Sequence, residues 1–157
     1  MRTIYIIRVI LVSVEAMILL CGSLIYWFFH NQFESFTKLF SFNDDILKYL
    51  MFMPVALAVW VSNEIRALLQ EDNETIVILT SWNDYWKLKA HVWVSLGYII
   101  LFTIMSIIPW LLGIGVHTGF GLLLFFVSII GQLYMALNIY LTRIRMKEII
   151  TVIKKSS

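Results

Sequence analysis

Four long apolar runs limit what this chain can fold into. They cover residues 4–29, 46–62, 90–112 and 116–141. A helix of about 20 apolar residues crosses the hydrocarbon core of a bilayer, so each run can span a membrane, the second only barely. The whole chain is 61% hydrophobic and 14% charged, whereas soluble domains are about 45–50% apolar and about 25% charged. The sequence therefore predicts an all-α membrane protein built as a four-transmembrane-helix bundle.

The distribution of positive charge predicts how this bundle is oriented. Ten of the 12 lysines and arginines lie near the N-terminus, in the loop at 63–89 or in the tail at 142–157. Only Lys38 and Lys48 lie on the opposite side, in or next to the outer loop at 30–45. Positively charged residues are retained on the cytoplasmic side of a membrane. We therefore expect both termini in the cytoplasm, and we expect the protein in the inner membrane of a bacterium.

Two of the predicted helices extend into the cytoplasm. The second span continues through polar residues as far as Gln70, and the third helix begins near Trp82, where Ser81 and Asp84 resemble a capping box. The tail continues the fourth helix as a basic amphipathic segment, which is typical of contact with anionic lipid. One membrane domain with cytoplasmic helix extensions is the expected organisation.

Aromatic and basic residues gather on this predicted cytoplasmic face. We expect them to contact lipid headgroups or a soluble cytoplasmic protein partner, and we expect no direct contact with nucleic acid, because the basic residues flank the spans instead of forming one groove. The set consists of Arg66, Trp82, Trp86, Lys87, Lys89, Arg143, Arg145 and Lys147.

Glu15 is the most informative polar residue in the spans. An ionised carboxylate at membrane depth costs several kcal/mol unless it is protonated, paired or hydrated. Ser95, Gln132 and Asn138 fall at comparable depths in the third and fourth spans, so the four residues are candidates for one intramembrane polar cluster. Gln132 and Asn138 lie about 120° apart on their helix, so at most one of them points straight at Glu15.

Two interpretations of this cluster remain open. Interhelical hydrogen bonds that fix the packing would account for it, at about 0.6 kcal/mol per contact. Alternatively, the cluster lines a water-filled path for ions or protons, with Glu15 as its titratable group. Pro54 is expected to kink the second span and is a candidate gating hinge.

The sequence contains few residues that could carry out enzymatic catalysis. The single cysteine, Cys21, cannot form an intramolecular disulfide pair, and no aspartate lies in any predicted span. Neither a glycine-rich phosphate loop nor a convergent Ser-His-Asp arrangement is present. The three histidines are divided between the two sides of the predicted membrane, which separates them too far to share a metal. We therefore expect a protein that is not an enzyme and that binds no cofactor or metal.

Two functions are compatible with this architecture. The first is assembly, in which the bundles form a homo-oligomer that acts as a pore-forming effector, or in which one bundle is the membrane subunit of a larger complex. The plan is similar to that of small membrane effectors and immunity proteins of bacterial defence, by architecture alone. The alternative is an ion- or proton-coupled small transporter or channel that uses Glu15. The sequence favours assembly, because charge, aromatic residues and helix extensions concentrate on the cytoplasmic face.

Overall fold

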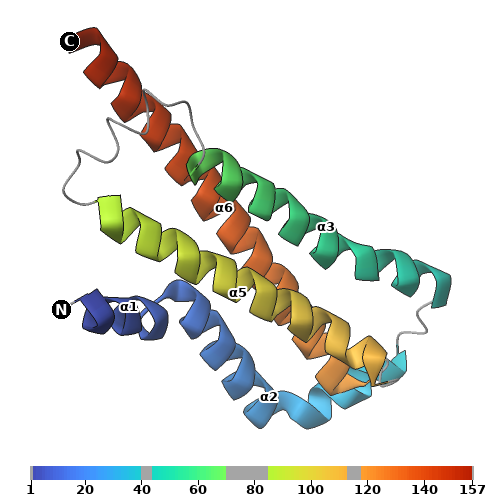
Figure 1. The fold of residues 1–157 in the computed structure, drawn as a ribbon. Helices are drawn as coiled ribbons and strands as arrows, with labels where there is room; N and C mark the ends of the chain where they lie inside the picture. Colours follow the sequence, from blue (N-terminus) through green and yellow to red (C-terminus); the bar gives the residue numbers. More distant parts are fainter. Residues whose placement is uncertain (1, 40–43, 70–84, 113–117, 157) are drawn as a thin grey trace.

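The fold is entirely helical over the residues that are described. A computed structural model describes residues 2–39, 44–69, 85–112 and 118–156. These residues form α1 (Arg2–Leu11), α2 (Val14–Leu39), α3 (Asp44–Leu69), α5 (Tyr85–Leu111) and α6 (Gly119–Ser156), as Figure 1 shows.

Three of these helices are long and apolar enough to cross a membrane. They are Val14–Lys38 in α2, Tyr85–Leu111 in α5 and Gly119–Thr151 in α6. In hydrocarbon a helix is favoured because it satisfies all backbone hydrogen bonds within one segment. The predicted second span lies in α3, which is not among these three, so four spans and the cytoplasmic position of the termini stay predictions.

Helix α6 is the axis of the bundle. It packs against α2, α3 and α5, while α3 also packs against α5 and α1 packs against α5. Figure 1 shows α1 and the end of α6 at the end of the bundle where α5 begins and α3 ends. The main apolar core joins α3, α5 and α6 through Val61, Ile65, Val92, Ile99, Phe102, Met135, Ala136 and Ile139.

Glycines allow α6 to approach its neighbours closely. A Cβ at Gly22 of α2 would lie 2.7 Å from Val127, and a Cβ at Gly131 would clash with the ring of Phe102 in α5. At the start of α6, a Cβ at Gly119 would lie 2.9 Å from the backbone nitrogen of Glu34. Small residues permit such contacts, which supply the van der Waals packing that holds membrane helices together.

Two elements differ from the sequence-based expectation. The first apolar run is not one helix, because a break at residues 12–13 divides it into α1 and α2. Conversely, α2 continues to Leu39 through much of the expected outer loop at 30–45. That segment contains no glycine or proline before Leu39, and Ser35 and Thr37 donate hydrogen bonds to carbonyls of their own helix. Nothing there stops the helix.

Both prolines lie inside helices and are fully buried. Pro54 lies within α3 and Pro109 within α5. Proline removes one backbone hydrogen bond and crowds the preceding turn, and membrane helices tolerate it where neighbouring helices cover the site. The structure thus places Pro54 in the position of the predicted hinge, with its role as a hinge still a prediction.

We expect Gly131→Ala to destabilise the bundle, because Phe102 is completely buried and its ring has no free space to enter. Overpacking a core costs about 1–3 kcal/mol, which denaturant titration in detergent micelles should detect as a lower free energy of unfolding. Gly97→Ala is the matched control, since a Cβ at Gly97 meets no atom within 4 Å. Equal losses in the two variants would contradict this packing.

Candidate functional site

The break between α1 and α2 is a capped helix start. The Oγ of Ser13 accepts a hydrogen bond from the backbone nitrogen of Ala16 at 3.1 Å, so Ser13 is the N-cap of α2. The carbonyl of Ile10, near the end of α1, accepts hydrogen bonds from the hydroxyls of Ser13 at 3.2 Å and Tyr98 at 2.7 Å. These contacts satisfy backbone groups that a helix end would otherwise leave exposed to lipid.

This break explains where two charged side chains lie in the first apolar run. Arg8 occupies the last turn of α1 and Glu15 the first turn of α2. A helix carries partial negative charge at its C-terminus and partial positive charge at its N-terminus, so each side chain has the favourable sign for its position. One short interruption therefore stabilises both a cation and an anion within an otherwise apolar segment.

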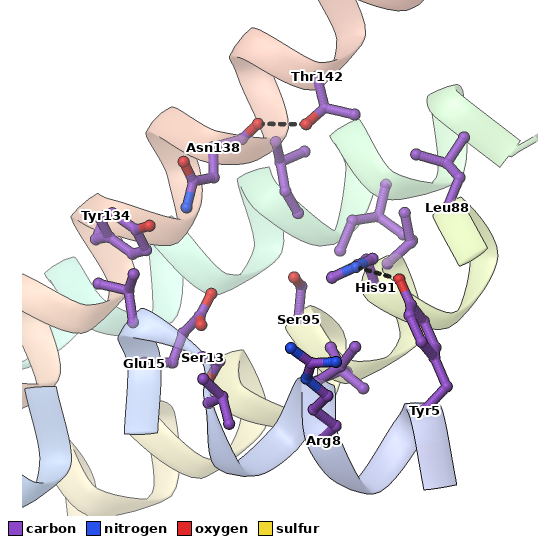
Figure 2. Close-up of a pocket in the computed structure, with 17 residues that line it drawn as sticks. Tyr5, Arg8, Ser13, Glu15, Leu88, His91, Ser95, Tyr134, Asn138 and Thr142 are labelled. Carbon is purple, nitrogen blue, oxygen red and sulfur yellow. Dashed lines mark hydrogen bonds between the residues drawn. The ribbon is translucent and has the colours of Figure 1, made fainter. Parts of the chain in front are cut away.

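A cavity of about 600 Å³, lined by both polar and apolar side chains, adjoins the break. It is bounded by α1, the start of α2, the first turns of α5 and the middle of α6, with Ile65 of α3 completing its wall. Figure 2 shows the side chains of Arg8, Glu15 and Ser95 pointing into it from three different helices. The polar residues that line it are Tyr5, Arg8, Ser13, Glu15, His91, Ser95, Tyr134, Asn138 and Thr142.

Glu15 lies deep in this cavity without a protein partner. Its side chain is 9% exposed, and within the described part of the chain no hydrogen bond or ion pair reaches its carboxylate. It is also the one carboxylate among the described residues that line the cavity. Arg8 faces the same cavity but is exposed, so it marks the mouth while Glu15 marks the interior.

The helix terminus favours an ionised Glu15. Glu15 is the second residue of the candidate span Val14–Lys38, so it lies at the end of that span and not at its centre. A favourable helix terminus contributes about 0.3–1 kcal/mol, and about 2 kcal/mol at best. Water, a proton or a bound cation in the cavity would add to this stabilisation.

Contacts between α1 and α5 close one side of the cavity. The hydroxyl of Tyr5 and Nε2 of His91 are hydrogen bonded at 3.0 Å. The ring of Tyr5 also meets the rings of Trp86 and His91 edge to face, with centroids 5.0 and 5.9 Å away. Together with the Tyr98 bond to Ile10, these contacts hold α1 against α5 and keep Arg8 at the cavity.

The structure brings three members of the predicted polar cluster together and separates the fourth. Glu15, Ser95 and Asn138 all line the cavity. Gln132 instead faces α5, where its Nε2 donates a hydrogen bond to Thr103 Oγ1 at 2.9 Å. Gln132 is 1% exposed, and its Oε1 has no hydrogen-bond partner in the part of the chain that the structure describes.

The predicted cytoplasmic contact residues fall into different environments. Arg143 pairs with Glu64 of α3, so it forms a contact within the bundle. Trp86 and Lys87 are half-buried, the ring of Trp86 contacts Tyr5 of α1, and Trp82 lies outside the described residues. The remaining members are exposed, namely Arg66, Lys89, Arg145 and Lys147.

Sequence reasoning missed Ser13 as a helix start and Arg8 as a cavity residue. The signal was present, because a serine followed two residues later by a glutamate is typical of an N-terminus. The apolar run from residue 4 to residue 29 predicted a single helix without a break. Tyr5 carried no local signal, since its role depends on His91, 86 residues away.

The described residues define a helical bundle with three helices of membrane-spanning length and a cavity at one end that contains charged and polar side chains. Comparison of the chain with protein families, curated proteins and solved structures finds no match. Among the described residues, no group of three or more histidines, cysteines, aspartates and glutamates is placed to hold a metal ion.

We expect Ser13→Ala to weaken the start of α2, because the amide of Ala16 loses its acceptor. Loss of an N-cap costs about 0.5–2 kcal/mol, measurable as a lower free energy of unfolding in detergent. Ser13→Thr keeps the hydroxyl and should stay near wild type. If the alanine and threonine variants were equally stable, Ser13 would not act as a cap.

Proposed function

We propose that this chain is an ion- or proton-coupled small transporter or channel in which Glu15 binds the moving cation or proton. The observation that carries this proposal is the deeply placed, unpartnered carboxylate of Glu15 in a cavity of about 600 Å³. A carboxylate without a protein partner retains its full capacity to accept a proton or to bind a cation. Purely structural hydrogen bonding would have used that capacity.

The position of the cavity supports an inward-facing state. Its lining residues come from α1, the start of α5 and the end of α3, which are the cytoplasmic ends in the predicted topology. Farther along the bundle from the cavity, Ile99, Phe102 and Met135 are at most 1% exposed and form an apolar barrier. A cavity at the predicted cytoplasmic end, with an apolar barrier beside it, is the arrangement expected of one state of a transporter.

A second polar position at the level of this barrier also supports the proposal. Gln132 and Thr103 are the sequence neighbours of Gly131 and Phe102, and the Oε1 of Gln132 has no hydrogen-bond partner among the described residues. An unsatisfied buried oxygen costs about 1–3 kcal/mol and is available to a passing ion or water. In the proposed mechanism a cation leaves Glu15 and reaches the amide oxygen of Gln132 when the barrier at Phe102 opens.

We expect Glu15→Gln to lower cation or proton flux by about tenfold or more, because the amide cannot take up a proton or hold a cation by charge. The measurement is proton entry into proteoliposomes driven by a potassium diffusion potential and followed with an internal pH dye, repeated as sodium entry with a sodium dye.

Glu34→Gln is the matched control for this experiment, since Glu34 is an exposed carboxylate on the same helix. Its flux should equal that of wild type. Wild-type vesicles that admit neither ion faster than protein-free vesicles would refute the proposal. So would a Glu15→Gln variant that conducts normally.

Assembly remains a second candidate function, and the surface of α2 favours it. Of the three helices of spanning length, α2 is the least buried, and it packs chiefly against α6. Trp27 and Phe28 are 83% and 73% exposed. Such a face is available to lipid or to a second copy of the chain, and a homo-oligomer would enclose a pore or offer a surface to a larger complex.

Oxidative crosslinking through Cys21 tests this candidate, because Cys21 is exposed on α2. A homo-oligomer built on α2 is expected to give a disulfide-linked dimer in lipid nanodiscs, and native mass spectrometry is expected to show more than one chain per particle. Cys21→Ser should abolish the crosslink and preserve the oligomer. Particles containing one chain each, without a crosslink, would exclude assembly through α2.

A further inference from the structure

The cavity contains two opposite charges that do not neutralise each other. Arg8 enters from the last turn of α1 and Glu15 from the first turn of α2, and both side chains point into the cavity in Figure 2. No salt bridge joins them within the described residues. A paired arginine and glutamate would need no ligand, whereas two separated charges in one cavity present a complementary surface to a ligand that carries both signs.

A lone cation satisfies only one of the two charges in this cavity. It would bind at Glu15 and leave the guanidinium of Arg8 without a counter-charge. A lone anion meets the converse problem. A zwitterion satisfies both groups, with its cationic end on the carboxylate and its anionic end on the guanidinium.

Burial determines which way round such a ligand would lie. Glu15 is 9% exposed and Arg8 is exposed, so the carboxylate is in the interior and the guanidinium is at the mouth. The ligand would therefore enter with its ammonium group first and leave its oxyanion at the mouth. Ser95 and Asn138 supply neutral hydrogen-bonding groups on the wall between α5 and α6.

The predicted topology indicates which kind of oxyanion the ligand carries. Arg8 lies near the inner edge of the first apolar run, at the level of the lipid phosphates. A guanidinium there is suited to bidentate hydrogen bonds with a phosphate. We propose that the cavity binds a phosphoester zwitterion, with its ammonium group on Glu15 and its phosphate on Arg8. This inference rests on the proposed role of the cavity as a binding site and names the class of ligand.

The experiment compares one zwitterion with its two charged fragments. Purified full-length protein in detergent is titrated calorimetrically with glycerophosphoethanolamine, with ethanolamine and with glycerol phosphate. Because each charge-assisted contact contributes to affinity, the zwitterion should bind at least about tenfold more tightly than either fragment. Equal affinities for the zwitterion and a fragment, or no binding of the zwitterion, would overturn the inference.

Two variants assign the two ends of the ligand. Glu15→Gln should weaken zwitterion binding by about tenfold without weakening the binding of glycerol phosphate, whereas Arg8→Gln should weaken zwitterion binding without weakening the binding of ethanolamine. Glu34→Gln and Arg145→Gln remove exposed charges and are the matched controls. Variants are compared only where circular dichroism and elution volume match wild type. If both variants bound all three ligands more weakly, and to the same extent, the inference would also be overturned.

The source of the zwitterion is resolved with short-chain lipids. Phosphatidylethanolamine that binds more tightly than glycerophosphoethanolamine, with phosphatidylglycerol binding weakly, identifies a lipid headgroup as the ligand. Equal binding of the lipid and the water-soluble compound identifies a free solute. If Glu15→Gln abolishes ion flux but the protein binds the zwitterion no more tightly than its fragments, this inference fails and the proposed function stands. If the protein binds the zwitterion selectively but conducts no ions, the proposed function fails and this inference stands.

Discussion

The helix break at residues 12–13 is the constraint on which the rest of the site depends. It ends α1 beside Arg8 and starts α2 beside Glu15, so each charge meets a helix dipole of the favourable sign. A continuous helix would have placed both charges on its side, where neither terminus could stabilise them. The hydroxyls of Ser13 and Tyr98 satisfy the exposed backbone at the break, and the cavity forms because α1 and α2 diverge there.

The remainder of the bundle separates a polar end from an apolar interior. Helix α6 carries both, since its Asn138 lines the cavity while Met135, one turn away, is completely buried. Hydroxyl groups along the helices are satisfied locally, as in the hydrogen bonds from Thr103 to Ile99 and from Ser128 to Leu124. This local bonding lets polar residues occupy the interior without forming a continuous aqueous path.

The sequence predicted the helical architecture better than it predicted the site. Apolar runs of spanning length identify helices because hydrocarbon permits few other structures, and three such helices are confirmed. The composition of the cavity was only partly predictable. The distance of each residue from the end of its predicted span placed Glu15, Ser95 and Asn138 at similar depths. It could not reveal that Arg8 and Tyr5 line the same cavity, because their position depends on a change of chain direction at Ser13.

The contact between Phe102 and Gly131 links the apolar barrier to the proposed transport. Phe102 is fully buried and its ring lies against the backbone of α6 at Gly131. A side chain at position 131 would collide with the ring, so this contact sets how closely α5 and α6 approach at the barrier. A movement of α5 against α6 that opened the barrier for the proposed transport would also alter the hydrogen bond between Gln132 and Thr103, because these residues join the same two helices beside the contact.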